Sequence, residues 1–464
     1  MVRLFRVFVP TSVLALLISE TILIFCCYVL ASFFVLDADP VIFLRYDGGL
    51  ARIALVVICV MIGIYFHDLY TQFRIRSRIL LVQQLCLVVG IAFLTQALLS
   101  YLRRPDWILP KWMMIAGSGM ALVLLPAWRM LYASVVIRAM GAQRVLFLGT
   151  SSLVRELSDY WQEHPELGLA SVGYLSDRDG EADEFPGLAR VGSIEDVGDV
   201  AAELMPDRIV VGLSERRIKL PVNELLDLRF SGLPIEDALA TYEASFGRIC
   251  IRELHPSQLI FAANLGPRPH RVFWQSIYSF GVALVVTIVT LPVIFVTALA
   301  VRLSSKGPVF FRQTRVGRNG VPFTLYKFRS MFVDAESRTG AVWATKDDPR
   351  ITPVGRWIRK LRIDELPQLF NVVRGEMSIV GPRPERPEFV RTLSEQIPYY
   401  RQRHYVKPGI TGWAQINHKY GDTIEDTITK LEYDLYYIKN LAPSLDAYII
   451  FHTLKVMLLS RGAQ

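Results

Sequence analysis

The chain has few residues that could form disulfides or a zinc site, and none of the usual nucleic-acid-binding motifs. Only five of its 464 residues are cysteines. Cys26, Cys27, Cys59 and Cys86 lie inside apolar runs and only Cys250 does not, a distribution that favours neither a disulfide framework nor a metal centre. We interpret the cysteines as small apolar side chains, and we expect no nucleic-acid partner.

Charged residues are also scarce, at 20% of the chain, whereas hydrophobic residues make up 52%. This balance is typical of membrane proteins. The formal net charge of +8 is unevenly placed: residues 302–464 carry 26 Lys and Arg against 16 Asp and Glu, and residues 1–301 carry 25 against 27. The basic excess of the C-terminal part therefore indicates an anionic lipid or a phosphorylated substrate as its partner.

The N-terminal part contains apolar runs, each near the ~20 residues that a helix needs to cross the hydrocarbon of a bilayer. There are four of them: 11–36, 50–66, 79–101 and 112–133. They predict a four-helix transmembrane module over residues 1–140. Arg74 and Arg76 follow the second run and Asp37 and Asp39 follow the first. By the positive-inside rule, both ends of the module face the cytoplasm, although basic residues after the third run argue the other way.

Residues 141–268 have the pattern of a soluble α/β domain, with strand-like segments such as RVLFLG and DRIVVGLSE separated by helical stretches. This alternation of strands and helices predicts a Rossmann-like domain. Its phosphate fingerprint is poor, because Gly149 is followed by Thr150, Ser151 and Ser152 where further glycines would be needed, and no Tyr-x-x-x-Lys pair occurs. We expect a regulatory or dimerising domain without a cofactor, with a bound nucleotide as the alternative.

A fifth apolar run, residues 280–301, has Pro292 in its middle and Arg271 and Arg302 at its flanks. A proline inside a helix removes a backbone hydrogen bond and clashes with the preceding turn, so a kinked spanning helix is one interpretation. However, after four spans a fifth crossing would place the basic C-terminal part outside the cell. We therefore predict a re-entrant helix that breaks near Leu291 and Pro292, with its freed backbone groups bonded inside the protein.

Basic residues then recur in short motifs. In FTLYKFRSM, the alternation of a strand would place Lys327 and Arg329 on one face, where two cations could meet one anion. An edge strand with solvated charges is the alternative. In GPRPERPEF, prolines on both sides of Arg383 stiffen the loop and reduce the entropy that the arginine loses when it binds an anion. We interpret Trp413, in KPGITGWAQIN, as a packing residue.

Two adjacent carboxylates, Asp364 and Glu365, follow a basic run in GRWIRKLRIDELPQLF. Neighbouring residues on a helix point about 100° apart, so this pair does not form a simple acid/base dyad across one substrate atom. One carboxylate could attack phosphorus while the other helps to hold a divalent metal, with arginines on the phosphate oxygens. Helix capping by Asp364, three residues before Pro367, is an equally open alternative.

These segments together resemble the bacterial sugar transferase family of monotopic phosphoglycosyl transferases. The resemblance rests on GPVFFRQTRVGRNGVPFTLYKFRSM, DDPRITPVGRWIRKLRIDELPQLFNVVRGEMSIVGPRPE and YVKPGITGWAQIN, in the family's order and spacing. It covers the chain from about residue 278 onward and implies a catalytic domain over residues 269–464. With its N-terminal spans, the chain is similar to the large form that initiates exopolysaccharide or O-antigen synthesis.

The resemblance implies a role for each motif residue. Asp364 matches the nucleophile, which attacks the β-phosphorus of a UDP-sugar, releases UMP and retains the phosphosugar. Glu365 matches its acidic partner, and the pair is implied to act with Mg2+. Pro292 falls where the family breaks its re-entrant helix, although the family often has Ser-Pro there. The motif cations are implied to bind substrate phosphate: Lys327, Arg329, Arg359 and Arg383.

The same resemblance implies the surroundings of the reaction. The acceptor is expected to be a polyprenyl phosphate, namely undecaprenyl phosphate, held in the lipid bilayer. We expect the enzyme in the bacterial inner membrane as a homodimer, with its catalytic domain on the cytoplasmic side, where nucleotide-activated sugars are found.

Two other functions are compatible with parts of the sequence. A membrane-bound nucleotide-sugar dehydratase or epimerase would use the middle domain, but the missing glycines and the missing Tyr-x-x-x-Lys pair count against it. A non-enzymatic scaffold for polysaccharide export would use the basic domain to bind anionic lipid, and it would not need the carboxylate pair.

Overall fold

The fold is taken from a computed structural model. It describes residues 2–4, 7–9, 11–36, 39–66, 78–101, 105–132, 142–164, 167–177, 187–212, 220–253, 266–333, 350–418 and 423–458. Apart from the first eight residues, the chain forms two compact units, Val9–Asp237 and Ala238–Gln464. Arg74, Arg76 and Asp37, on which the predicted orientation partly depends, lie outside the described residues.

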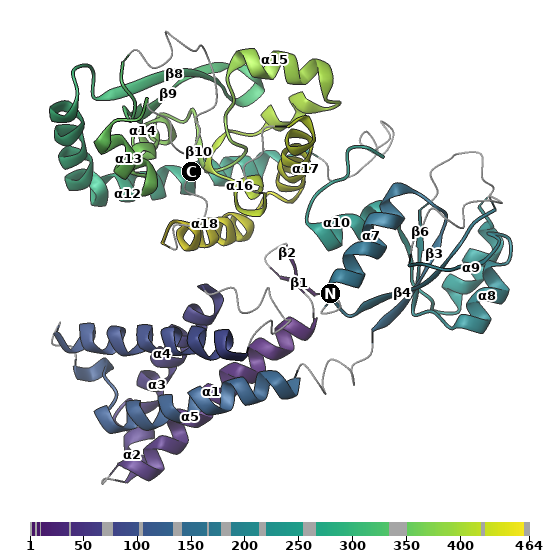
Figure 1. The fold of residues 1–464 in the computed structure, drawn as a ribbon, viewed down its shortest axis with the longest axis horizontal. Coiled ribbons are helices and arrows are strands. Elements are labelled where there is room, and N and C mark those ends of the chain that lie inside the picture. The colour runs from purple at the N-terminus through teal and green to yellow at the C-terminus, as the bar shows by residue number, and fades with distance from the viewer. Residues whose placement is uncertain are drawn as a thin grey trace. The chain divides into compact units, whose positions relative to one another are not determined.

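The first unit contains the apolar helices of the N-terminal part (Figure 1). Its elements in this part are α1 (Thr11–Val35), α2 (Pro40–Arg45), α3 (Gly49–Phe66), α4 (Arg78–Tyr101), η1 (Pro105–Trp107) and α5 (Lys111–Leu131). The short strands β1 (Val2–Leu4) and β2 (Val7–Val9) precede them in the chain. Four of these helices, α1, α3, α4 and α5, are long and apolar enough to cross a membrane. Their positions match the four predicted apolar runs.

Helices α1 and α5 pack antiparallel through buried polar contacts. A carboxylate oxygen of Glu20 lies 2.5 Å from Nε of Arg129, and both side chains are almost fully buried. The hydroxyl groups of Tyr28 and Ser118 are hydrogen-bonded at 2.8 Å. A Cβ at Gly117 would lie 2.3 Å from the Tyr28 ring, so only glycine allows this approach. These contacts specify which faces of α1 and α5 meet.

The first unit also contains the α/β part that the sequence predicts. Its elements are β3 (Gln143–Leu148), α7 (Ser152–Glu163), β4 (Leu169–Leu175), β5 (Arg190–Gly192), α8 (Val197–Leu204), β6 (Arg208–Val211), α9 (Val222–Phe230) and β7 (Ile235–Asp237). The five strands are parallel in the order β5-β4-β3-β6-β7. Relative to their order in the chain this is 3-2-1-4-5, the arrangement of a Rossmann sheet.

The second unit carries the predicted motifs. Its elements are α10 (Ala238–Phe246), α12 (Pro269–Ser304), β8 (Phe310–Val316), η5 (Arg318–Gly320), β9 (Pro322–Phe328), α13 (Pro353–Lys360), η6 (Ile363–Glu365), α14 (Gln368–Val373), β10 (Ser378–Val380), α15 (Pro387–Gln396), η7 (Tyr400–Tyr405), β11 (Gly409–Thr411), α16 (Trp413–Asn417), α17 (Ile424–Asn440) and α18 (Pro443–Leu458). Strands β8 and β9 form an antiparallel hairpin, and β10 pairs with β11 in parallel.

Helix α12 is a fifth helix long and apolar enough to enter a membrane, and only 17% of its apolar window is buried. The predicted break at Leu291 and Pro292 needs correction, because the helix is continuous through both residues. The ribbon of α12 bends along its length in Figure 1. Besides the proline, Thr287 and Thr290 hydrogen-bond to carbonyl groups four residues earlier, which favours bending. Its re-entrant course through a membrane stays a prediction.

Buried polar groups attach the first half of α12 to the rest of the unit. The side-chain amide of Gln275 donates to the carbonyl oxygen of Val380 at 3.2 Å and to the carboxylate of Asp446 at 2.9 Å. The hydroxyl of Tyr437 also donates to Asp446, at 2.8 Å. Because Val380 is three residues before Arg383, this network ties α12 to the loop that carries the predicted phosphate-binding arginine.

A segment that the sequence assigns to the middle domain packs on the C-terminal unit instead. We call residues 238–253 the docking segment. Ile249 and Ile251 join the apolar cluster around α17, and Arg248 forms an ion pair with the buried Glu432 at 3.5 Å. The indole nitrogen of Trp413 donates to the carbonyl oxygen of Gly247 at 2.7 Å. The two units divide after Asp237. The domain boundary that the sequence indicates, between residues 268 and 269, stays a prediction.

Candidate active site

The two carboxylates lie in one short turn after α13. This helix begins at its N-cap Thr352, whose side chain accepts a hydrogen bond from the amide of Gly355. It ends at Lys360, and Leu361 is its C-cap. Arg362 then adopts the left-handed conformation before the 3-10 turn η6, which holds Asp364 and Glu365. The capping alternative for Asp364 is wrong, because the N-cap of the next helix, α14, is Pro367.

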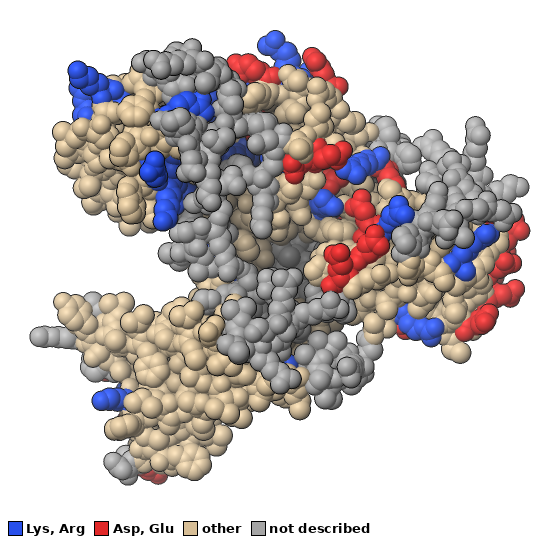
Figure 2. All heavy atoms as spheres, viewed as in Figure 1, with Lys and Arg blue, Asp and Glu red and all other residues tan. Residues whose placement is uncertain are grey.

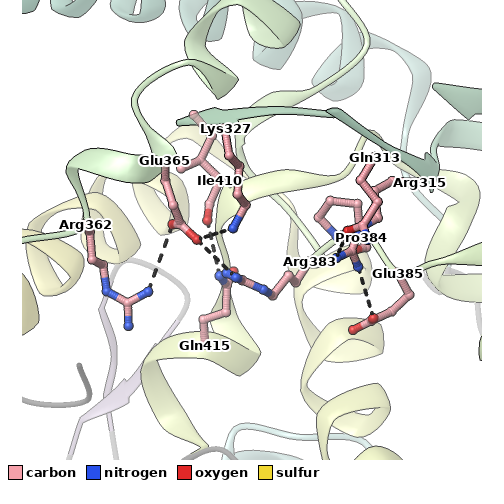
Figure 3. Close-up of polar contacts among 10 residues, drawn as sticks. All are labelled: Gln313, Arg315, Lys327, Arg362, Glu365, Arg383, Pro384, Glu385, Ile410 and Gln415. Carbon is pink, nitrogen blue, oxygen red and sulfur yellow. Dashed lines mark hydrogen bonds and ion pairs between the residues drawn. The ribbon is translucent and has the colours of Figure 1, made fainter. Parts of the chain in front are cut away.

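Glu365 is surrounded by positive charge (Figure 3). Its Oε1 atom accepts hydrogen bonds from Nζ of Lys327 at 2.9 Å and from Nη2 of Arg383 at 3.1 Å. Its Oε2 atom lies 4.0 Å from Nη1 of Arg362. Burial opposes ionisation, but Lys327, Arg383 and Arg362 outweigh it and lower the pKa of Glu365. Glu365 is therefore an ionised anchor for these cations at neutral pH.

Asp364 has the opposite electrostatic balance. Burial and the negative charge of Glu365 raise its pKa to about 6, although Lys327, Arg359 and Arg383 act in the other direction. Its carboxylate is thus ionised at neutral pH but carries an energetic penalty. A partly desolvated carboxylate beside several cations has the properties that a nucleophile for phosphorus needs.

The hairpin β8–β9 presents Lys327 to the site. Tyr326 and Phe328 flank it in the strand and point to the other face, where Phe328 is buried against Phe310. The strand is fastened at Tyr326, whose amide donates to the side chain of Asn371 at 3.2 Å. The alternation of the strand therefore places Lys327 as the sequence predicts, and the edge-strand alternative does not describe this residue.

The loop that carries Arg383 is held by two other arginines. Nη1 of Arg315 donates to the carbonyl oxygen of Pro384 at 3.0 Å and pairs with Glu385 at 3.5 Å (Figure 3). Arg403 donates to the carbonyl oxygen of Arg383 itself, also at 3.0 Å. Arg403 is buried and lies 2.8 Å from a carboxylate oxygen of the buried Asp434. The loop is thus fixed before any substrate arrives.

Arg329 does not join this group, and its predicted place beside Lys327 needs correction. Strand β9 ends at Phe328, so the alternation that would align the two cations stops one residue too early. Arg329 is buried and donates to the carbonyl oxygens of Ser305 and Lys306 at 2.8 and 2.9 Å. These groups follow the end of α12, so Arg329 stabilises the C-terminal end of that helix.

The remaining predicted residues take different positions. Arg359 lies in the last turn of α13, where its charge favours the ionised form of Asp364. Pro292 lies inside α12. Trp413 is buried and stacks on Tyr436, which confirms its interpretation as a packing residue. The sequence places Arg362 in the basic run before the carboxylates without a role of its own, and the structure puts its Nη1 atom 4.0 Å from Oε2 of Glu365.

The donor set at the site suits a hard cation. Among the described residues, no group of three or more His, Cys, Asp and Glu side chains is placed to hold a metal. Mg2+, however, is commonly bound through one or two carboxylates together with substrate phosphates. Asp364 fits this pattern. Burial and the neighbouring charge of Glu365 raise its pKa, and a divalent cation beside it would favour the ionised carboxylate against both effects.

Comparison with known proteins places this site in a family. The model of a protein family described as "Bacterial sugar transferase" matches residues 267–460, which include every site residue named above. A Bacillus subtilis protein named "Uncharacterized sugar transferase EpsL" is 42% identical over 190 residues, which are 90% of its own length and 41% of this chain. The chain belongs to the bacterial sugar transferase family.

Relatives with more specific names match over longer stretches. The UDP-N-acetylgalactosamine-undecaprenyl-phosphate N-acetylgalactosaminephosphotransferase of Aeromonas hydrophila is 43% identical over 232 residues, 50% of this chain and 54% of the relative. The UDP-glucose:undecaprenyl-phosphate glucose-1-phosphate transferase of Klebsiella pneumoniae is 36% identical over 316 residues, 67% of either chain. The chain thus spans about half the length of the first of these relatives and two thirds of the second.

Proposed function

We propose that this protein transfers a sugar 1-phosphate from a UDP-sugar to a polyprenyl phosphate and releases UMP. The observation that carries the proposal is the partly desolvated carboxylate of Asp364 beside Glu365, whose charge holds Lys327 and Arg383 at 2.9 and 3.1 Å. The names of the relatives from Aeromonas and Klebsiella support this donor and acceptor class.

The reaction takes two displacement steps at one phosphorus atom. A carboxylate oxygen of Asp364 forms a bond to the β-phosphorus of the UDP-sugar, and the bond from that phosphorus to the bridging oxygen breaks, so that UMP leaves with the electron pair. An oxygen of the polyprenyl phosphate then attacks the same phosphorus. The bond to Asp364 breaks, the carboxylate is restored, and a polyprenyl diphosphate sugar is formed.

The surrounding cations stabilise the charge that develops on the phosphate oxygens. Lys327 supplies a compact ammonium group, and Arg383 a planar guanidinium that suits phosphate geometry. Glu365 keeps both in place while the site is empty, because it accepts hydrogen bonds from both. Asp364 and Glu365 would also hold Mg2+, which when bound would neutralise the diphosphate and make UMP a better leaving group.

The bilayer supplies the acceptor, and α12 is the element that reaches it. Large apolar side chains are exposed along both halves of this helix, among them Phe273, Trp274, Val289 and Phe295. We propose that α12 is embedded in the bacterial inner membrane, with the catalytic domain on the cytoplasmic side and undecaprenyl phosphate as the lipid. A cysteine introduced at the exposed position of Arg312 should then resist an impermeant thiol reagent applied to intact cells, and efficient labelling would exclude this orientation.

Two further assignments extend the proposal: the protein acts as a homodimer, and it performs the first step of exopolysaccharide or O-antigen synthesis.

The direct test of the activity is UMP release. Membranes that contain the protein are incubated with polyprenyl phosphate, Mg2+ and one UDP-sugar at a time. At least one sugar should give UMP and a labelled lipid with the native chain but not with Asp364→Asn. Conversion of the nucleotide sugar without UMP release would favour a dehydratase or epimerase, and no reaction with any donor would favour a scaffold.

A further inference from the structure

Arg403 is a buried arginine whose guanidinium joins three parts of the second unit. Its Nη1 atom donates to the hydroxyl of Tyr400 at 2.8 Å, in the same 3-10 turn η7. Its Nη2 atom donates to the carbonyl oxygen of Arg383 at 3.0 Å and lies 2.8 Å from Oδ2 of Asp434 in α17. One side chain therefore connects the loop that carries Arg383 to α17.

The helix that carries Asp434 is a firm support. Leu431 and Leu435 lie on either side of Asp434 in α17, and both belong to the apolar cluster that also contains Tyr400. Because closely packed side chains leave little room for movement, the helix holds the carboxylate of Asp434 at a defined place in the unit.

The ion pair of Arg403 and Asp434 is almost completely buried, with 8% and 2% of the two side chains exposed. Burial removes both charges from water, and their attraction offsets this cost only when the geometry is excellent. The pair does fix a direction. Because the guanidinium is planar and rigid, contacts with Tyr400 and Asp434 also determine where Nη2 meets the carbonyl oxygen of Arg383.

Arg383 is thereby held at both of its ends. Its Nη2 atom donates to Oε1 of Glu365 at 3.1 Å (Figure 3), and its backbone carbonyl accepts from Arg403. The side chain is still 31% exposed, so a ligand can reach it. A long side chain on a fixed backbone has less conformational freedom to lose when it binds phosphate.

We propose that Arg403 and Asp434 are positioning residues for the transfer reaction, which act through Arg383 and do not contact the substrate. Asp434 orients Arg403, and Arg403 sets the backbone from which Arg383 reaches the phosphate. This inference rests on the proposed function, because it gives Arg383 its role toward the sugar donor. It extends the active site to a buried carboxylate on α17.

The test uses the full chain in nanodiscs, with a UDP-sugar that supports UMP release. Arg403→Lys keeps a positive charge for Asp434 but lacks the fork that also reaches the carbonyl of Arg383. Its kcat/KM should fall on the order of 10- to 100-fold, because a displacement of about 1 Å can cost 100-fold in rate. In an Arg383→Ala background, measured at raised enzyme concentration, the same change should cost less than about twofold, since the side chain that it positions is gone.

Melting temperatures distinguish this role from a structural one. Arg403→Lys should lower the melting temperature by the same amount in both backgrounds, although its effect on kcat/KM nearly disappears in the second. A second variant combines Arg403→Met with Asp434→Val and removes both buried charges together. Its melting temperature should stay close to that of the native chain, because apolar replacement of a buried pair is often neutral, whereas its kcat/KM should fall as it does in Arg403→Lys.

Arg401→Lys is the matched control, because Arg401 is an exposed arginine of the same turn. It should leave kcat/KM unchanged. The inference is overturned if Arg403→Lys keeps native kcat/KM, or if it costs the same factor in both backgrounds, as expected of a residue that only stabilises the fold. Lack of UMP release by the native chain with every donor is a different result, because it removes the proposed function itself.

Discussion

Asp364 and Glu365 are neighbours in the chain, yet their carboxyl groups have opposite pKa shifts. Cations that Glu365 contacts directly lower its pKa, whereas burial and the charge of Glu365 raise that of Asp364 to about 6. A raised folded-state pKa means that the stability contributed by protonated Asp364 is present below its ordinary pKa and is lost as the pH rises through about 6. The charged form that the chemistry needs is therefore the form that folding disfavours.

The activity should follow the ionised fraction of Asp364. We expect kcat/KM to fall as the pH drops below about 6, because a protonated carboxyl group is a poor nucleophile. Arg359→Gln should move this acid limb to higher pH, since the charge of Arg359 favours ionised Asp364. Glu365→Gln should lower the pH at which its remaining activity declines, since the charge of Glu365 opposes the ionisation of Asp364.

Melting temperatures at the same pH values provide the control. They distinguish a loss of activity caused by protonation of Asp364 from one caused by acid unfolding. Other buried carboxyl groups with raised pKa values, such as Asp434 and Asp446, also change protonation in this range and affect stability. A limb that shifts in the same direction in both variants would contradict the assignment of this pKa to Asp364.

The positions of some site residues could be predicted from the sequence, and those of others could not. Lys327 and Arg383 could be predicted, because a strand alternation and a pair of prolines fix their local geometry. Arg329 could not, since its direction depends on β9 ending one residue earlier and on the nearby end of α12. The positive φ of Arg362 could not be predicted either, because a left-handed backbone at an arginine depends on tertiary packing and not on local propensity.

At the level of elements, the apolar helices could be predicted from length and composition alone. The bounds of α1, α3, α4 and α5 differ from the predicted runs by only one or two residues, whereas α12 begins at Pro269, well before the predicted run 280–301. The continuous course of α12 through Pro292 could not be predicted. A helix retains a proline when neighbouring contacts support both sides, and here Ala283 and Ile294 pack in separate apolar clusters of the same unit. The sequence pattern shows the proline but not these contacts.

The docking segment changes what a minimal catalytic fragment should contain. A fragment that begins at residue 238 should be better folded and more active than one that begins at 267, in detergent or nanodiscs. The shorter fragment loses Ile249 and Ile251, each about 1.5 to 3 kcal/mol of apolar burial, and the partner of Glu432. Melting temperature and UMP release measure both effects.

Trp413→Phe in the longer fragment is the matched control, because it removes the hydrogen bond to Gly247 and part of the buried ring but keeps an aromatic ring beside Tyr436. Its loss should be smaller than that of deleting the segment. Equal stability and activity of the 238 and 267 fragments would show that the docking segment is dispensable and would support the boundary predicted from the sequence.

For the whole molecule, composition indicated a membrane protein with a basic C-terminal part, and the structure adds where the charge gathers. Several cations of the second unit converge on one pair of carboxylates, and exposed apolar side chains lie along the helix that precedes them. A cationic cluster around two carboxylates therefore lies in the same unit as a helix suited to the bilayer. This combination is what the proposed transfer from a nucleotide sugar to a membrane lipid requires.

The central claim is a covalent phosphosugar on Asp364, and it is tested by withholding the lipid. The purified full chain with UDP-sugar and Mg2+ should release at most about one equivalent of UMP and gain the mass of a sugar phosphate, which polyprenyl phosphate should then remove. Peptide mapping should place the adduct on the segment IDELPQL, and Asp364→Asn should fold but form no adduct. An adduct on another residue, or full turnover by Asp364→Asn, would contradict the account.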